Sequence, residues 1–203
     1  MLAGIDVSTY QGEIDWPAVK AAGIEFAFIR ASHGIDEDAR FETNWSGARD
    51  AGVVRGAYQF FRPSQDPIAQ AELVLAKVGT LAPDDLPPVI DVEAADDLPP
   101  ADVATAVRGW LDRVIAVIGR RPIIYTGLYF WRDHVGVDLT SSPLWHAQYT
   151  DAPCPRIAPP WTDWTIWQYT NKGHVDGIAG PVDLDRWRGD RASLDAFMRP
   201  GGR

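Results

Sequence analysis

The sequence predicts an α/β fold, an irregular TIM-like barrel of about five βα units followed by three strands that are connected by loops. Three observations support this prediction. Apolar, β-rich runs recur at a fairly steady interval, helical patterns fill the first gaps between them, and the later gaps are interrupted by proline and glycine. Alternating strands and helices are typical of parallel sheets, and eight strands can close a barrel, although 203 residues lie at the lower end of the usual size range.

Eight segments have the composition of strands. Several are nearly continuous apolar runs, as expected for strands that are buried on both faces. In chain order they are LAGIDV (2–7), EFAFIRA (25–31), VVRGAYQFF (53–61), LPPVIDVE (86–93), RPIIYT (121–126), PLWHAQY (143–149), WTIWQY (164–169) and VDLD (182–185).

Helical patterns lie between the first six of these segments. Asp15 can cap a helix that carries Pro17 in its first turn and ends at Gly23. Apolar residues recur at helical spacing in the other gaps. The segments predicted to be helical there are 41–51, 66–79, 100–118, which has the clearest pattern, and 127–134.

The later gaps differ in composition. Segment 150–162 is interrupted by prolines and 170–181 is rich in glycine. Neither can form the helical crossover that parallel strands ordinarily need, so we expect loops here and allow the last strands to run antiparallel. We predict a single domain over 1–198 and interpret the tail 199–203 as the stub of a linker.

Composition and charge narrow the range of partners. Hydrophobic residues make up 46% of the chain, which favours a packed core, and the formal net charge is −9. Nucleic acids and anionic membrane surfaces are bound through basic patches, so we expect neither as a partner. No apolar run is long enough to span a membrane, and the N-terminus lacks the features of a signal peptide. A neutral sugar polymer remains compatible with this charge, and we expect a monomer.

Metal-binding patterns are weak. The single cysteine, Cys154, cannot form an internal disulfide or build a zinc site alone, and the four histidines show no metal-binding spacing. We therefore predict no cofactor, although a group of carboxylates could in principle hold Mg²⁺ or Ca²⁺.

Four acidic residues lie at the ends of predicted strands, where α/β barrels form their sites. They are Asp6, Asp91, Glu93 and Asp183. Asp91 and Glu93 point to the same face of one strand, with Cα atoms about 6.6 Å apart. Two adjacent, half-buried carboxyls do not both ionise easily, so one keeps its proton and can protonate a leaving group, as in glycoside hydrolysis. The alternative is a structural role in ion pairs with Arg30, Arg55 or Arg62.

Aromatic and amide residues occupy neighbouring strand positions. The chain has nine tryptophans, six tyrosines and seven phenylalanines, and many of these are expected in the core. Rings and amides at the mouth of an acidic cleft would suit a sugar chain with N-acetyl groups. The residues predicted to bind substrate are Tyr58, Phe60, Tyr125, Trp145, Gln148, Trp167 and Gln168.

The motifs resemble, in order, those of glycoside hydrolase family 25, the Chalaropsis-type lysozymes. They are GIDVSTYQGEIDW, FAFIRASHG, AGVVRGAYQFF, LPPVIDVE, IIYTG, LWHAQY, WTIWQYT and VDLDRW, and together they cover roughly residues 3–187. The resemblance implies an irregular barrel, no metal, and cleavage of the β-1,4 bond between N-acetylmuramic acid and N-acetylglucosamine. Glu93 would then be the proton donor, with Asp6, Asp91 and Asp183 completing the acidic cluster. Gln59, His146 and Asp185 depart from the commoner pattern.

These observations lead to an expected mechanism and setting. We expect retention of anomeric configuration, with the substrate's N-acetyl oxygen attacking and Asp91 orienting it; direct attack by a carboxylate is the alternative. A chitinase-like hexosaminidase and an inactive peptidoglycan-binding lectin are the rival functions. The substrate would be bacterial peptidoglycan, reached either as an extracellular enzyme or as a phage-released endolysin.

Overall fold

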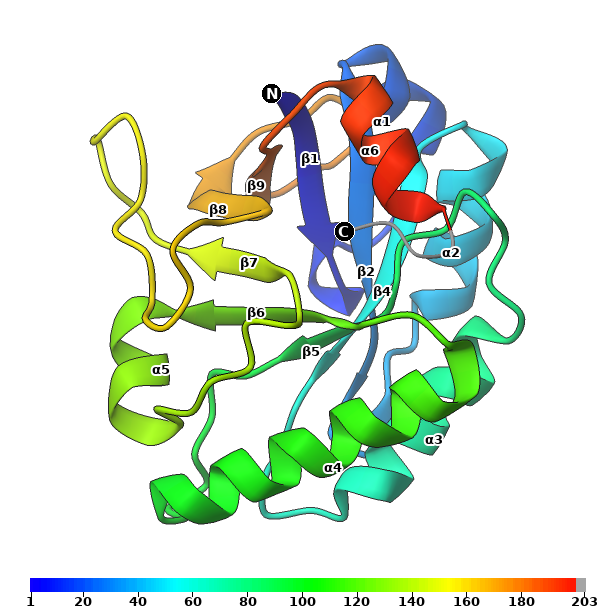
Figure 1. Ribbon diagram of the computed structural model, residues 1–203. Coiled ribbons are helices and arrows are strands. Elements are labelled where there is room, and N and C mark those ends of the chain that lie inside the picture. The colour runs from blue at the N-terminus through cyan, green and yellow to red at the C-terminus, as the bar shows by residue number, and fades with distance from the viewer. Residues whose placement is uncertain (200–203) are drawn as a thin grey trace.

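The sheet closes on itself. Strand β1 (Leu2–Val7) pairs with β2 (Ile24–His33) on one side and with β9 (Val182–Trp187) on the other. The order β1-β9-β8-β7-β6-β5-β4-β2 therefore returns to its start, and a short ninth strand, β3 (Asp36–Glu37), is added to β2. This computed structural model describes residues 1–199 and confirms the irregular TIM-like barrel (Figure 1).

Five helices alternate with the first barrel strands, as predicted. The other strands are β4 (Val54–Phe60), β5 (Val89–Asp91), β6 (Ile123–Gly127), β7 (Leu144–Ala147) and β8 (Ile166–Gly173). The helices are α1 (Trp16–Ala21), α2 (Phe41–Asp50), α3 (Pro67–Val78), α4 (Pro100–Ile118), α5 (Leu128–His134) and a terminal α6 (Arg191–Met198). Asp15 caps α1 by accepting from the Ala18 N–H at 3.1 Å, which confirms the start predicted for this helix. No helix within residues 1–199 is long and apolar enough to cross a membrane.

The last three strands are joined without helices, but only β9 runs antiparallel to its neighbours. β7 and β8 pair in parallel through the loop 148–165, so the predicted loop connection is present here without an antiparallel turn of the chain. This loop is long enough to bring the chain back to the start of the next parallel strand. Hydrogen bonds hold it against the barrel. The Trp161 indole donates to the Ser142 carbonyl at 2.9 Å, and the His146 ring lies 2.9 Å from the Arg156 carbonyl.

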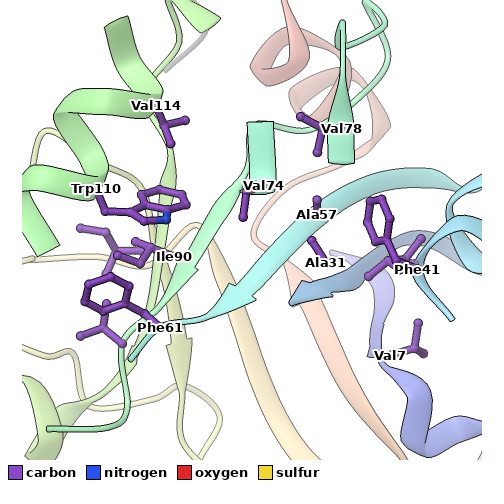
Figure 2. Packing of buried hydrophobic residues seen from close by; sticks show 14 of the residues in the cluster. Val7, Ala31, Phe41, Ala57, Phe61, Val74, Val78, Ile90, Trp110 and Val114 are labelled. Atoms are coloured by element: carbon purple, nitrogen blue, oxygen red, sulfur yellow. The ribbon is translucent and has the colours of Figure 1, made fainter. Parts of the chain in front are cut away.

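The core has two parts. One lies between the sheet and the surrounding helices, where Phe61, Ile90 and Trp110 pack together (Figure 2). The other fills the barrel interior and includes Phe28 and Trp145 as well as Leu194, Phe197 and Met198 of α6. Helix α6 packs into this interior cluster near the start of β1 (Figure 1). The end of the barrel at the carboxyl ends of its parallel strands is left free for a site. Of the predicted linker stub 199–203, residues 200–203 lie outside the described part of the chain.

Candidate active site

A cavity of about 430 Å³ opens at the carboxyl ends of the parallel strands. The four predicted acids all line it, together with five of the seven residues predicted to bind substrate. These nine residues are Asp6, Asp91, Glu93, Asp183, Tyr58, Phe60, Tyr125, Trp145 and Gln168. Barrel closure brings them together from seven different strands and the segment after β5.

The register of the sheet explains how the acids meet. Asp6 on β1 lies directly opposite Asp183 on β9. Asp91 is the last residue of β5, and Glu93 lies just beyond the strand on the same side, because Val92 between them is buried in the outer core. The backbone stays extended there, since the Val92 N–H donates to the Tyr125 carbonyl at 2.9 Å.

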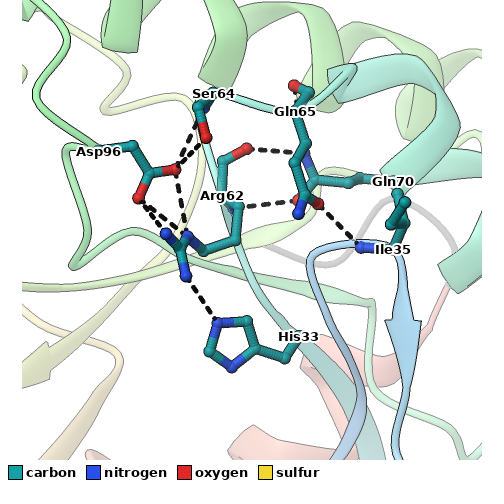
Figure 3. A network of polar contacts seen from close by, with 7 residues as sticks. All are labelled: His33, Ile35, Arg62, Ser64, Gln65, Gln70 and Asp96. Atoms are coloured by element: carbon teal, nitrogen blue, oxygen red, sulfur yellow. Dashed lines mark hydrogen bonds and ion pairs between the residues drawn. The ribbon is translucent and has the colours of Figure 1, made fainter.

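The three arginines that might have neutralised these acids are engaged elsewhere. Arg30 pairs with Asp38 at 2.8 Å and Arg55 with Asp85 at 2.7 Å. Arg62 pairs with Asp96 at 2.7 Å, and the same carboxylate accepts from Ser64 (Figure 3). Of the three, only Arg30 also lines the cavity. The alternative role, in which the four acids form ion pairs with these three arginines, is therefore not found in the structure.

Burial and mutual repulsion favour the protonated forms of the cluster. Burial raises the pKa of Asp91 well above its usual range, and the Glu93 charge raises it further, whereas Arg30 lowers it. The Asp91 Oδ1 atom is buried and has no hydrogen-bond partner in the structure. Burial also raises the pKa of Asp183, to about 6. The cluster therefore holds protons more tightly than free carboxyls do.

Glu93 combines access with a raised pKa. The residue is exposed at the rim, but the protein around its carboxyl still removes enough water to raise the pKa. The Asp183 charge raises this pKa further, while the nearby Tyr125 hydroxyl lowers it. A protonated carboxyl that solvent and a ligand can reach has the properties of a general acid.

A hydrogen-bonded chain connects the cavity wall to Asp6. The hydroxyls of Tyr125 and Tyr149 both donate to the Gln168 Oε1 atom at 2.9 Å. The Gln168 Nε2 amide in turn donates to Asp6 Oδ2 at 2.8 Å. With its carbonyl occupied by two donors, the Gln168 amide is fixed in orientation and holds the Asp6 carboxyl in place.

Most of the predicted aromatic residues form the floor of the cavity. Trp145 is 1% exposed and stacks on Phe28 with ring centroids 4.4 Å apart. The exposed rings are instead Tyr10 and Tyr149, which are 81% and 51% exposed and which the sequence analysis did not select. Tyr10 lies in a short 3-10 turn, Thr9–Gln11, held because the Thr9 N–H donates to Asp38 Oδ2 at 3.0 Å. These two rings are the faces available for stacking on a sugar.

Two residues predicted to bind substrate, Gln148 and Trp167, lie outside the cavity. Trp167 and Gln168 are adjacent on β8, and alternation lets only one of them face the interior. Trp167 packs on the outer surface, where its indole donates to the Gln148 carbonyl at 2.8 Å and Arg186 lies over its ring. The Gln148 side chain accepts from the Arg156 N–H at 2.6 Å. The structure therefore gives neither residue a path to a ligand in this cavity.

The three positions that depart from the family pattern differ in where they lie relative to the cavity. Gln59 and His146 are fully buried and do not line the cavity. The Gln59 amide donates to Ser32 Oγ at 2.7 Å, and its carbonyl accepts from the Trp110 indole at 2.6 Å. Asp185, in contrast, lies inside the barrel beside the acidic cluster. Within residues 1–199, no group of three or more His, Cys, Asp or Glu side chains is arranged to hold a metal ion.

Comparisons with known proteins agree with this architecture. The model of the family described as "Glycosyl hydrolases family 25" matches residues 5–178. "Uncharacterized protein YegX" of Escherichia coli (strain K12) is 36% identical over 96% of this chain and 72% of its own length. "Lysozyme M1" of Streptomyces globisporus is 35% identical over 96% of this chain and 70% of its own length. The crystal structure of the bacterial lysozyme from Streptomyces coelicolor superposes with a TM-score of 0.92 and 32% identity, covering 100% of this chain and 98% of that one.

Proposed function

The chain belongs to glycosyl hydrolase family 25 and is a glycoside hydrolase with muramidase activity, and on this basis we propose the bond that it cleaves and the roles of its residues. The bond is the β-1,4 linkage between N-acetylmuramic acid and N-acetylglucosamine in bacterial peptidoglycan. Cleavage proceeds with retention and with assistance from the substrate's N-acetyl group. The observation behind this proposal is the cavity in which Asp91 and Glu93 lie beside Asp6 and Asp183.

Glu93 donates a proton to the glycosidic oxygen as the bond breaks. Its raised pKa supports this role, since the donor has to be protonated before the reaction. Asp91 and Glu93 do not both ionise easily, and in the active state the proton is on Glu93 and the charge on Asp91. The Arg30 charge acts in that direction, because it lowers the pKa of Asp91 against the larger effect of burial.

Asp91 orients the acetamide of the sugar whose anomeric carbon reacts. As the leaving group departs, the acetamide oxygen bonds to the anomeric carbon, and positive charge spreads onto the ring that forms. The Asp91 Oδ1 atom, buried and without a partner, is suited to accept the acetamide N–H and to stabilise this charge. Water then opens the ring on the face that the leaving group left, with Glu93 now acting as base, and configuration is retained.

The remaining residues position these two and the substrate. Asp183 keeps the pKa of Glu93 raised, and Asp6 is held by Gln168. Tyr10 and Tyr149 at the rim stack on sugar rings on either side of the scissile bond. The catalytic unit is a single domain over 1–198 that acts as a monomer on the cell wall, as an extracellular enzyme or a phage-released endolysin.

Analysis of the new reducing ends tests this proposal. Purified cell walls should lose turbidity, and borohydride reduction of the products should convert N-acetylmuramic acid to its alcohol. Chitin oligomers serve as the comparison substrate and should be cleaved far more slowly. Reduced N-acetylglucosamine as the main product, or a preference for chitin, would contradict the assignment.

A further inference from the structure

Asp185 is a buried carboxyl for which the mechanism above has no use. It lies on β9, two residues after Asp183, and is 1% exposed. One of its oxygens, Oδ1, accepts from the Trp145 indole at 2.8 Å. The other, Oδ2, is buried with no N–H or O–H donor in reach. An ionised carboxylate in this position would leave a charged oxygen without water or a partner, which is costly.

Strand pairing places Asp185 against Asp6. Asp6 lies opposite Asp183, and Gly4 lies opposite Asp185, so Asp6 and Asp185 are diagonal neighbours on the interior face of the antiparallel pair. Glycine has no side chain, so nothing on β1 stands between the Asp185 carboxyl and Asp6. The two carboxyls are close enough that each shifts the pKa of the other. Two carboxyls can be in such contact only if one of them carries a proton.

We propose that Asp185 and Asp6 share one proton in a hydrogen bond between their carboxyls, so that Asp185 is a positioning residue for Asp6. Asp6 is then held from two sides, by the shared proton with Asp185 of β9 and by the Gln168 amide of β8, which donates at 2.8 Å. Asp185 is in turn anchored by Trp145 from β7. The charged groups facing the pair are Asp183 on β9 and Asp91 at the end of β5, and both disfavour a second negative charge. The orientation of Asp6 on the cavity wall thus depends on a proton held inside the barrel.

This proton has a consequence for stability that can be measured without any substrate. In the unfolded chain, Asp185 titrates near 3.8, whereas burial raises the pKa of both Asp6 and Asp185 in the fold. Above pH 4 the folded pair therefore keeps a proton that the unfolded chain has lost, and stability falls as pH rises. Asp185→Asn carries no such proton, yet its amide can donate to Asp6 and its carbonyl can accept from Trp145.

The test compares Asp185→Asn and Asp185→Ala with the wild type and with Asp176→Asn, an exposed aspartate in the loop before β9. Denaturant unfolding is measured between pH 5 and pH 8. In the wild type, the free energy of unfolding should fall with rising pH by a slope that includes about one proton from this pair. Asp185→Asn should lose that contribution, whereas Asp176→Asn should keep it. An unchanged slope in Asp185→Asn would overturn the shared proton, whatever the enzyme's activity.

Activity provides a second readout, which rests on the proposed function. Asp185→Asn should keep cell-wall hydrolysis within about threefold of the wild type, whereas Asp185→Ala, which loses a charge-assisted hydrogen bond, should fall by about tenfold or more. Rescue by asparagine distinguishes a donor to Asp6 from mere filling of space. Equal activity of the two folded variants would reject the positioning role. If Asp185→Asn loses the pH dependence of stability but the wild-type enzyme does not hydrolyse cell walls, the result would count against the proposed function and not against the shared proton.

Discussion

Glu93→Gln should reduce the rate of cell-wall hydrolysis by about 10²–10⁴-fold, the contribution usual for a general acid. The amide has the same shape but cannot give up a proton to the glycosidic oxygen. Wild-type activity should itself decline as pH rises, because the raised pKa of Glu93 sets the pH at which the donor loses its proton. The measurement is the initial rate of turbidity loss from pH 4 to pH 8.

A matched variant separates this effect from the loss of any surface carboxylate. Glu13 is a glutamate whose side chain is 90% exposed and which does not line the catalytic cavity. Glu13→Gln should hydrolyse walls at the wild-type rate. Because the fold raises the pKa of Glu93 and so makes its ionised form unfavourable, Glu93→Gln should be at least as stable as the wild type at pH 7. A Glu93→Gln enzyme with wild-type lysis would exclude Glu93 as the acid.

Asp91→Asn is expected to lower kcat by about 10²–10³-fold, similar to the removal of one group that stabilises transition-state charge. Asparagine can still form a hydrogen bond, but it supplies no negative charge to the ring that forms when the acetamide attacks. KM should change little, because the effect lies mainly in the transition state. Rates on soluble peptidoglycan fragments at several concentrations separate the two parameters.

Stability provides the control for Asp91→Asn. Burial raises the pKa of Asp91, so ionising it in the fold is unfavourable, and asparagine removes that cost. The variant should therefore be as stable as the wild type at pH 7, or more so. Asp85→Asn is the contrasting case, because Asp85 is buried in an ion pair with Arg55, away from the cavity. It should lose stability and keep its kcat. An Asp91→Asn enzyme that is less stable than the wild type but has a normal kcat would show that Asp91 has a structural and not a catalytic role.

Local patterns in the sequence predict most of the barrel. The apolar runs, the helical spacing between them and the capping residue Asp15 identify five βα units, because caps and buried strands depend on residues close in the chain. Helix α6 was missed, although Asp190 caps it and Leu194, Phe197 and Met198 recur at helical spacing. The parallel pairing of β7 and β8 depends on loop contacts such as that of Trp161 with Ser142, which no local pattern encodes.

The acids of the site could be predicted and the surfaces around them only in part. Asp91 and Glu93 share a face through strand periodicity, and closure of the barrel places Asp6 by Asp183. Trp167 was selected with Gln168 even though adjacent strand residues face opposite sides. Tyr149 is two positions from β7 and could have been found by the same alternation. The exposure of Tyr10 depends on the turn held by Asp38, a contact between segments far apart in the sequence.

The anomeric configuration of the first product tests the central claim most directly. Proton NMR of a soluble peptidoglycan fragment, recorded within minutes of adding enzyme and before mutarotation, distinguishes the two anomers of the new reducing end. If Glu93 and Asp91 work with the substrate's acetamide as proposed, the β-anomer forms first and the α-anomer grows in slowly. An α-anomer as the first product would mean that water attacks directly from the opposite face, and it would contradict the account.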